Sequence, residues 1–182
     1  MVKEMKWYIR VLKQIYLEQE NYPKVLNCII KDTLRRNQSF TFIKSVFTES
    51  KFSDENRKEV EQEILSSFLD LFHTDVKKTG TIVFQFIPQT VPEVLEKVRG
   101  EPEYPEFLSN LLELYELAEP GSPRRRMEDV FRVELFEEYI EILCQSSHQS
   151  VLQYVKSKEN YRSEVGFLFL LPQMFLFVKS FF

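Results

Sequence analysis

The side chains that could do acid–base chemistry are carboxylates on two predicted helices. They form two groups: Glu59, Glu61 and Glu63, and Glu137, Glu138 and Glu141. Paired carboxylates act as general acid and base where a pocket shifts their pKa values, but on an amphipathic helix such residues are typical of a solvated face. No nucleophile motif such as G-x-S-x-G is present in the sequence. We therefore predict no catalytic residue and a protein that is not an enzyme.

The two histidines and two cysteines are too scattered to predict a metal site. His73 follows Phe72 at the end of a predicted helix, His148 lies near the start of another, and neither has a third ligand near it in the sequence. Cys28 and Cys144 lie far apart in apolar runs, where free thiols behave as small buried hydrophobes and suit a reducing cytosol. Only four glycines are present, which argues against a Gly-rich phosphate loop. We expect neither metal nor cofactor.

The one basic run, Arg124–Arg126, lies in the segment that is most clearly a loop, EPGSPRRR at 119–126. It could bind phosphate on a membrane or on a partner, but Glu119, Glu128 and Asp129 flank it and weaken its field. We interpret it as a solubilising loop. The net charge of −4 argues against a nucleic-acid-binding function.

The elements that must position these residues are predicted to be helices. A chain of 182 residues with 43% hydrophobic and 29% charged residues can form one domain with a real core. Its apolar residues recur at three- and four-residue spacing, which is the helical period. The predicted core faces are, in chain order, Trp7, Tyr8, Val11, Leu12, Ile15 and Tyr16; Val25, Leu26, Ile29 and Ile30; Phe40, Phe42, Ile43, Val46 and Phe47; Val60, Ile64, Leu65, Phe68, Leu69 and Phe72; Phe107, Leu108, Leu111, Leu112 and Tyr115; Val133, Phe136, Ile140 and Leu143; and Val151, Leu152 and Val155.

Capping residues mark where these helices begin. The predicted N-caps are Asn21, Ser53, Asp75, Thr90 and either Ser146 or Ser147. Pro23 and Pro92 fall in first turns, where a missing N–H costs little. The segment 79–87 (TGTIVFQFI) has the β-branched content of a strand. We predict a helix there, because a lone strand among helices would leave its backbone groups unpaired.

Short amphipathic helices joined by short loops indicate an all-α architecture. The first two predicted helices are separated by only a few residues and should form an antiparallel hairpin. Paired helices at this spacing predict an α-solenoid, in which each pair packs on its neighbours. A compact helical bundle is the alternative.

Two segments resemble a known family of helical repeats. They are WYIRVLKQIYLEQENYPKVLNCIIKD (7–32), and ELFEEYIEILCQSSHQSVLQYVKSKENYRSE (134–164). The first has an aromatic helix, a Tyr at the turn and a short apolar helix ending in Asp. The second has a helix ending in Leu-Cys, a polar turn, a second helix and a Tyr-Arg pair. In these features the chain resembles the clathrin-heavy-chain-like family of vacuolar sorting proteins, over roughly residues 7–164.

The resemblance implies a non-enzymatic scaffold segment of an endosomal membrane-tethering subunit. Within the family, the pattern is most similar to a subunit of the class C core vacuole/endosome tethering complex, CORVET. The implied partners are the other subunits of that complex and an early-endosomal Rab GTPase, and the implied location is cytoplasmic, at the periphery of the endosome membrane. The charged N-terminus has no apolar signal region, so we expect no signal peptide.

The last 18 residues depart from the family pattern. We divide the chain into a helical-repeat segment at 1–164 and an apolar tail at 165–182 (VGFLFLLPQMFLFVKSFF). Translation into a retained intron would produce such a tail, and the alternative is a true isoform whose tail dips into a membrane. The second hypothesis makes the chain a peripheral membrane protein anchored by its tail. We expect the tail instead to pack on the exposed end of the solenoid, because its apolar residues would surround any helix on all sides.

Overall fold

The computed structural model describes residues 2–117, 135–145 and 154, and every regular element in these ranges is a helix. The chain divides into two compact units after Leu135. The first unit contains α1 (Val2–Glu18), α2 (Tyr22–Lys31), α3 (Gln38–Thr48), α4 (Asp54–Ser66), α5 (Phe68–Phe72), α6 (Val76–Phe86), the 3₁₀ turn η1 (Pro88–Thr90), α7 (Val91–Val98) and α8 (Tyr104–Leu117). The all-α prediction is confirmed.

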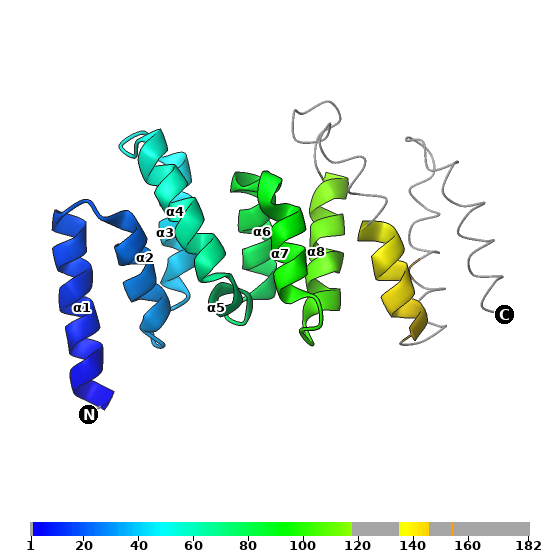
Figure 1. Cartoon of the computed structure of the whole chain (residues 1–182), viewed down its shortest axis with the longest axis horizontal. Helices are drawn as coiled ribbons and strands as arrows, with labels where there is room; N and C mark the ends of the chain where they lie inside the picture. The colour runs from blue at the N-terminus through cyan, green and yellow to red at the C-terminus, as the bar shows by residue number, and fades with distance from the viewer. Residues whose placement is uncertain (1, 118–134, 146–153, 155–182) are drawn as a thin grey trace. The chain divides into compact units, whose positions relative to one another are not determined.

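The first two helices form the predicted antiparallel hairpin (Figure 1). The Asn21 side chain accepts a hydrogen bond from the backbone N–H of Lys24, which satisfies one of the unpaired donors at the start of α2. Pro23 lies in the first turn as expected. The apolar stripe of α2 is buried throughout, so this helix is the first part of the core.

The prediction for the α1 core face is wrong in part. Trp7 is 69% exposed, Tyr8 58% and Ile15 40%. The helix packs chiefly against α2, and Arg10 and Tyr16 reach α2 through an ion pair with Asp32 and a cation–π contact with Lys24. The helix is therefore amphipathic as predicted, but part of its apolar face points to solvent.

A break at Ser67 divides the predicted fourth helix into α4 and α5. Its start is as predicted: the Ser53 side chain accepts from the Asn56 N–H, and the Asn56 side chain accepts from the Ser53 N–H, which completes a capping box. Leu71 is buried, whereas Leu69, which we predicted in the core, is 41% exposed.

The segment with strand-like composition is helical, as predicted. Helix α6 begins at an Asp75 cap that accepts from the Lys78 N–H, and it ends at Phe86, with Ile87 as the residue after the last turn. It packs between α3 and α8, which buries Ile82, Val83 and Phe84. Tertiary packing therefore overrides the local β propensity.

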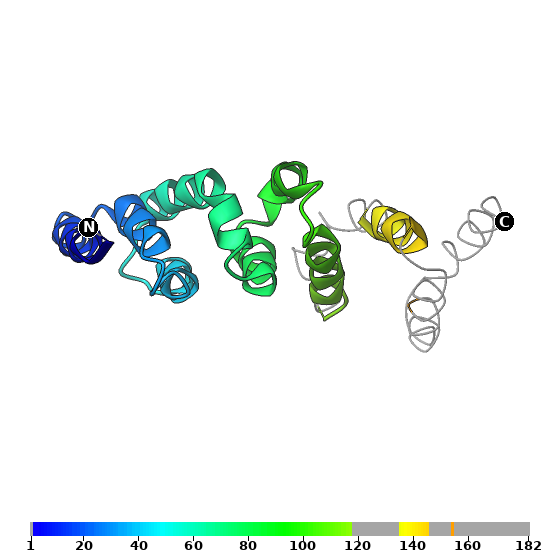
Figure 2. The ribbon, with the colours of Figure 1, turned by 90° about the horizontal axis from the view of Figure 1, so that it is seen from below.

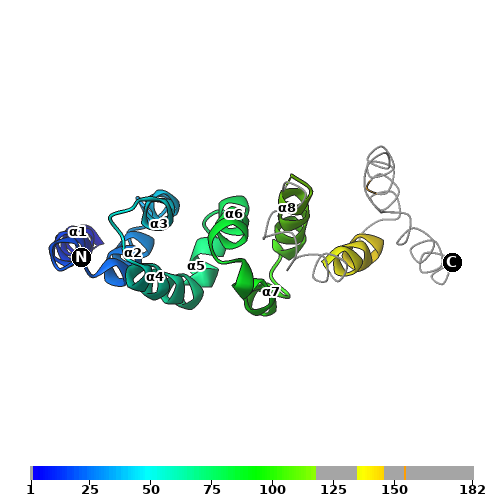
Figure 3. The same cartoon turned by 90° about the horizontal axis from the view of Figure 1, so that it is seen from above.

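Within the first unit, the helices form two rows (Figures 2 and 3). One row contains α2, α4, α5 and α7, and the other contains α3, α6 and α8. Contacts run along both rows, and α2 with α3, α3 with α4 and α5 with α6 also touch across them. Such neighbour-to-neighbour packing is typical of a helical-repeat protein. Thr90 precedes α7 as predicted, but its hydroxyl donates to the Ile87 carbonyl and makes no capping bond to the helix.

In the second unit, the described residues are 136–145, which are helical, and residue 154. Phe136 and Ile140 are buried, and Leu143 is half-buried. The Tyr154 ring lies 5.8 Å from that of Phe136 and 5.1 Å from that of Tyr139. The predictions for Arg124–Arg126, Val133, Ser146, Ser147, His148, Val151, Leu152, Val155 and 165–182 lie outside the described residues.

Candidate functional site: a histidine and two carboxylates beside a turn

Of the three candidate carboxylates on α4, Glu61 and Glu63 accept hydrogen bonds from other elements of the fold. Glu63 accepts from the Asn27 amide on α2 at 2.7 Å and from the Ser67 hydroxyl at 2.8 Å, so it joins two neighbouring helices and the α4–α5 break. Glu61 accepts from Gln89 in η1 at 2.7 Å, and Glu59 is exposed. In the second unit, Glu137 and Glu141 are exposed and Glu138 is half-buried. The spacing of these residues predicted a solvated helix face. It did not predict that Glu63 would accept hydrogen bonds that connect α4 to α2.

The structure places His73 close to two carboxylates that are distant from it in the sequence. It is the residue after α5, and its ring lies edge-on to Phe72 at 5.6 Å. The Phe72 ring packs in turn on Phe107 of α8 at 5.5 Å, and Phe68 packs on the same ring at 6.1 Å. These buried rings hold the end of α5 against the start of α8.

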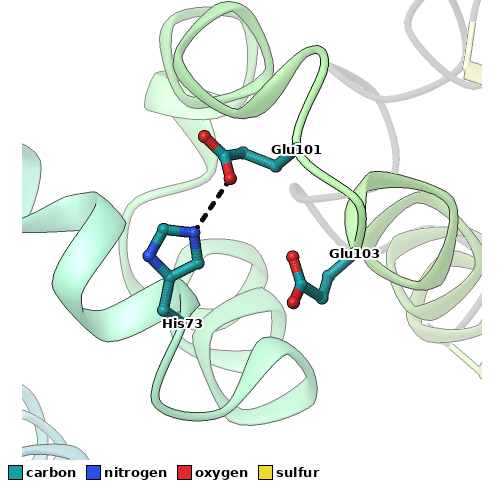
Figure 4. A group of neighbouring side chains, drawn as sticks. All are labelled: His73, Glu101 and Glu103. Atoms are coloured by element: carbon teal, nitrogen blue, oxygen red, sulfur yellow. Dashed lines mark hydrogen bonds and ion pairs between the residues drawn. The ribbon is translucent and has the colours of Figure 1, made fainter.

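The turn between α7 and α8 supplies two carboxylates to the same place. Gly100 has φ +99°, a left-handed conformation that other residues rarely adopt. Backbone bonds from Glu101 N to Val98 O and from Tyr104 N to Glu101 O close the turn. This geometry places Glu101 and Glu103 on the side that faces His73 (Figure 4).

Three potential ligand atoms therefore converge. His73 Nε2 lies 3.0 Å from a Glu101 carboxylate oxygen, and one ligand atom from each of the three residues lies within 4.8 Å of the others. The His73 side chain is 46% exposed and that of Glu101 is 32% exposed, so the cluster opens to solvent. By contrast, Glu103 Oε2 is buried and has no hydrogen-bond partner.

Sequence reasoning missed this cluster because 28 residues separate His73 from Glu101. A search for a third ligand close to His73 in the sequence could not find it. The signal that could have pointed to it is the turn GEPE at 100–103, in which two acidic residues flank a proline directly after a glycine.

A second polar feature lies between α1 and α2. A shallow cavity of about 170 Å³ is lined by Ile9, Arg10, Lys13, Gln14, Cys28, Ile29, Asp32, Arg35 and Gln38. The Asp32 carboxylate is buried, lies 3.2 Å from Arg10 Nε in an ion pair, and accepts a hydrogen bond from the backbone N–H of Leu34. Burial raises the pKa of the Cys28 thiol, although the charges of Lys31 and Lys13 oppose this shift.

Burial and the charge of Glu141 likewise raise the pKa of the thiol of Cys144, which lies in the second unit. Both cysteines are free and remain protonated thiols, which are poor nucleophiles.

The fold defines the class of protein: within the described residues, it is an all-α chain of paired helices in two rows. The comparisons with known proteins then point to one protein in particular. The chain is 23% identical to the mouse (Mus musculus) vacuolar protein sorting-associated protein 8 homolog and 22% identical to the human (Homo sapiens) one, over 166 residues in each case. The resemblance to a vacuolar sorting protein is confirmed.

The similarity covers 90% of this chain but only 11% of each relative's length. No family model matches the chain, and a search of the solved structures found no match. Among the residues that the structure describes, no helix combines the length and the apolar character needed to cross a membrane.

Proposed function

We propose that this chain is a non-enzymatic scaffold segment that acts in vacuolar or endosomal protein sorting as part of a membrane-tethering complex of the CORVET type. The observation that carries the proposal is the similarity to vacuolar protein sorting-associated protein 8 homologs along 90% of the chain. The helical-repeat packing supports it, because stacked helix pairs present extended surfaces for protein partners.

The α1 surface supports a role in protein binding. Trp7, Tyr8 and Ile15 lie on one helix and are all at least 40% exposed. Exposed apolar residues that gather on one face mark interaction sites more often than singly scattered ones do, and aromatic residues are enriched in the energetic centres of interfaces. The proposed partners are the other subunits of the tethering complex and an early-endosomal Rab GTPase, at the cytoplasmic periphery of the endosome membrane.

A pull-down from cells tests the proposal. The tagged chain should enrich tethering-complex subunits, and a variant with Trp7→Ser and Ile15→Ser should lose most of that enrichment. Leu34→Ser is the matched control, because Leu34 is as exposed as Trp7 but lies between α2 and α3. Failure of the unmodified chain to enrich any subunit of the complex would overturn the proposal.

Rescue of endosomal sorting separates binding from tethering. Tethering needs two attachment points held apart on one rigid body, and a chain that matches 11% of its relatives' length contains few of the repeats over which such points could be distributed. We expect the chain to bind partners but not to restore sorting in cells that lack the full-length relative. Full rescue would show that the functional core lies within these helices.

A further inference from the structure

We propose that the cavity between α1 and α2 binds an acidic peptide segment of a partner protein, with one aromatic side chain in the cavity and carboxylates on either side of it. The two helices of the first hairpin (Figure 1) and the residues after α2 line this cavity, which has a volume of about 170 Å³. The site is separate from the exposed Trp7 and Tyr8, and the inference does not depend on the proposed sorting function.

One wall of the cavity is apolar. It consists of Cys28 and Ile29 of α2, which are buried, and Ile9 of α1, which is half-buried. An apolar protein cavity of about 150 Å³ can hold a benzene molecule, so this cavity has room for one phenyl ring. Covering the apolar wall with such a ring removes apolar surface from water, which favours binding.

The polar side of the cavity carries more positive than negative charge. Arg10, Lys13 and Arg35 line it together with one carboxylate, that of Asp32. Asp32 already has Arg10 Nε at 3.2 Å and the Leu34 N–H as partners. Arg10 therefore offsets the charge of Asp32, and the charges of Lys13 and Arg35 are left in excess.

The side chains of Lys13 and Arg35 are available to a ligand. Within the part of the chain that the structure describes, neither makes a hydrogen bond or an ion pair. Their position also matters for the apolar wall: burial raises the pKa of the Cys28 thiol, and the charges of Lys31 and Lys13 lower it. The wall is therefore exposed to a positive potential, which attracts an anionic ligand.

The distribution of charge along the sequence agrees with an acidic partner. Residues 1–36, which include α1 and α2, contain eight Lys or Arg residues and only four Asp or Glu, although the whole chain has a net charge of −4. Such complementarity gives specificity and speeds association.

A peptide fits the cavity better than other anions do. A bilayer surface is flat and cannot fill a concavity between two helices, and an inorganic anion would leave the apolar wall uncovered. A peptide with an aromatic residue between carboxylates serves both the apolar wall and the two cations.

Fluorescence anisotropy with the full chain and a labelled peptide tests the site. The probe is the heptapeptide EEDFDEE, and its control is EEDSDEE, which has the same charge but no ring. We expect saturable binding of EEDFDEE that weakens as salt is added, and binding of EEDSDEE that is weaker by about fivefold or more, because the ring no longer covers the wall. Equal binding of the two peptides would overturn the proposal, as would the absence of saturable binding.

Charge reversals locate the site. Lys13→Glu with Arg35→Glu should weaken binding of EEDFDEE by at least about tenfold, because two attractions become repulsions. Lys44→Glu with Lys58→Glu is the matched control, because it changes the net charge equally at exposed residues of α3 and α4 outside the cavity. The control pair should weaken binding by less than about twofold. An equal loss in both pairs would refute the site, since it would show that only net charge matters.

Two further measurements protect the test. Circular dichroism melting checks that each variant is folded, and Arg35→Gln alone, at an exposed residue, should still weaken binding by about two- to fivefold. Unchanged affinity in Arg35→Gln would count against the site even if the double variant fails to fold. Phosphatidylserine liposomes should displace the peptide poorly from the unmodified chain. Efficient displacement would identify a lipid surface as the ligand and overturn the peptide assignment.

Discussion

Replacement of Gly80 by alanine tests how closely α6 and α8 approach each other. A Cβ atom at this position would overlap Asn110 Oδ1 of α8, with Asn110 Cγ at 3.4 Å and Phe107 Cε2 at 3.5 Å. Asn110 Oδ1 is buried and has no hydrogen-bond partner. Asn110 as a residue is only half-buried, but its amide must turn or shift to admit a Cβ atom at position 80.

Two opposing terms set the expected change in the free energy of unfolding. Alanine inside a helix stabilises by about 0.5–1 kcal/mol relative to glycine. Overpacking a well-packed contact costs about 1–3 kcal/mol. We therefore expect Gly80→Ala to destabilise the chain by about 1 kcal/mol, because the steric term exceeds the gain in helix propensity.

The same substitution made in an Asn110→Ala background should have the opposite sign. There the obstacle is gone, and only the propensity gain of about 0.5–1 kcal/mol remains. Urea denaturation of the four chains, followed by circular dichroism, gives the coupling between the two sites. If Gly80→Ala has the same effect in both backgrounds, the close approach of α6 and α8 is not what the glycine permits.

Three further predictions concern a cap, a helix-to-helix bond and the tail. Burial would raise the pKa of the Asp75 carboxyl, but hydrogen bonds from Lys78 and the positive charge of Lys78 hold this pKa below its ordinary value of 3.8. The stability that ionised Asp75 contributes is therefore present above about pH 4 and is lost as the pH falls through the lowered pKa. Asp75→Ala should cost about 1 kcal/mol at pH 7, and the difference from the unmodified chain should shrink in denaturation curves at acidic pH. Glu63→Ala should cost about 1–3 kcal/mol in urea denaturation, because it removes the acceptor of the part-buried Asn27 amide; a change close to zero would show that water replaces it. Finally, the full chain and a chain ending at Glu164 should behave alike in liposome flotation, and strong flotation of the full chain alone would favour a membrane anchor.

Local chemistry made the helix starts predictable from the sequence. A cap such as Asn21, Ser53 or Asp75 accepts from a backbone N–H three residues later, so both partners lie within one turn. The helical period likewise predicted the buried faces of α2 and α8. For the segment 79–87, local propensity pointed to a strand, and the argument that a lone strand has no partner led to the helix that is observed.

Tertiary structure decided which apolar residues are buried and which polar residues meet. The sequence pattern could not show that Trp7 and Tyr8 lie on a side of α1 left uncovered within the described residues, because a hydrophobic face predicts burial whether or not a neighbour exists. Nor could it bring His73 to Glu101 and Glu103. That meeting depends on the contact of Phe72 with Phe107 and on a left-handed turn at Gly100, and such contacts between distant segments form only when the helices pack.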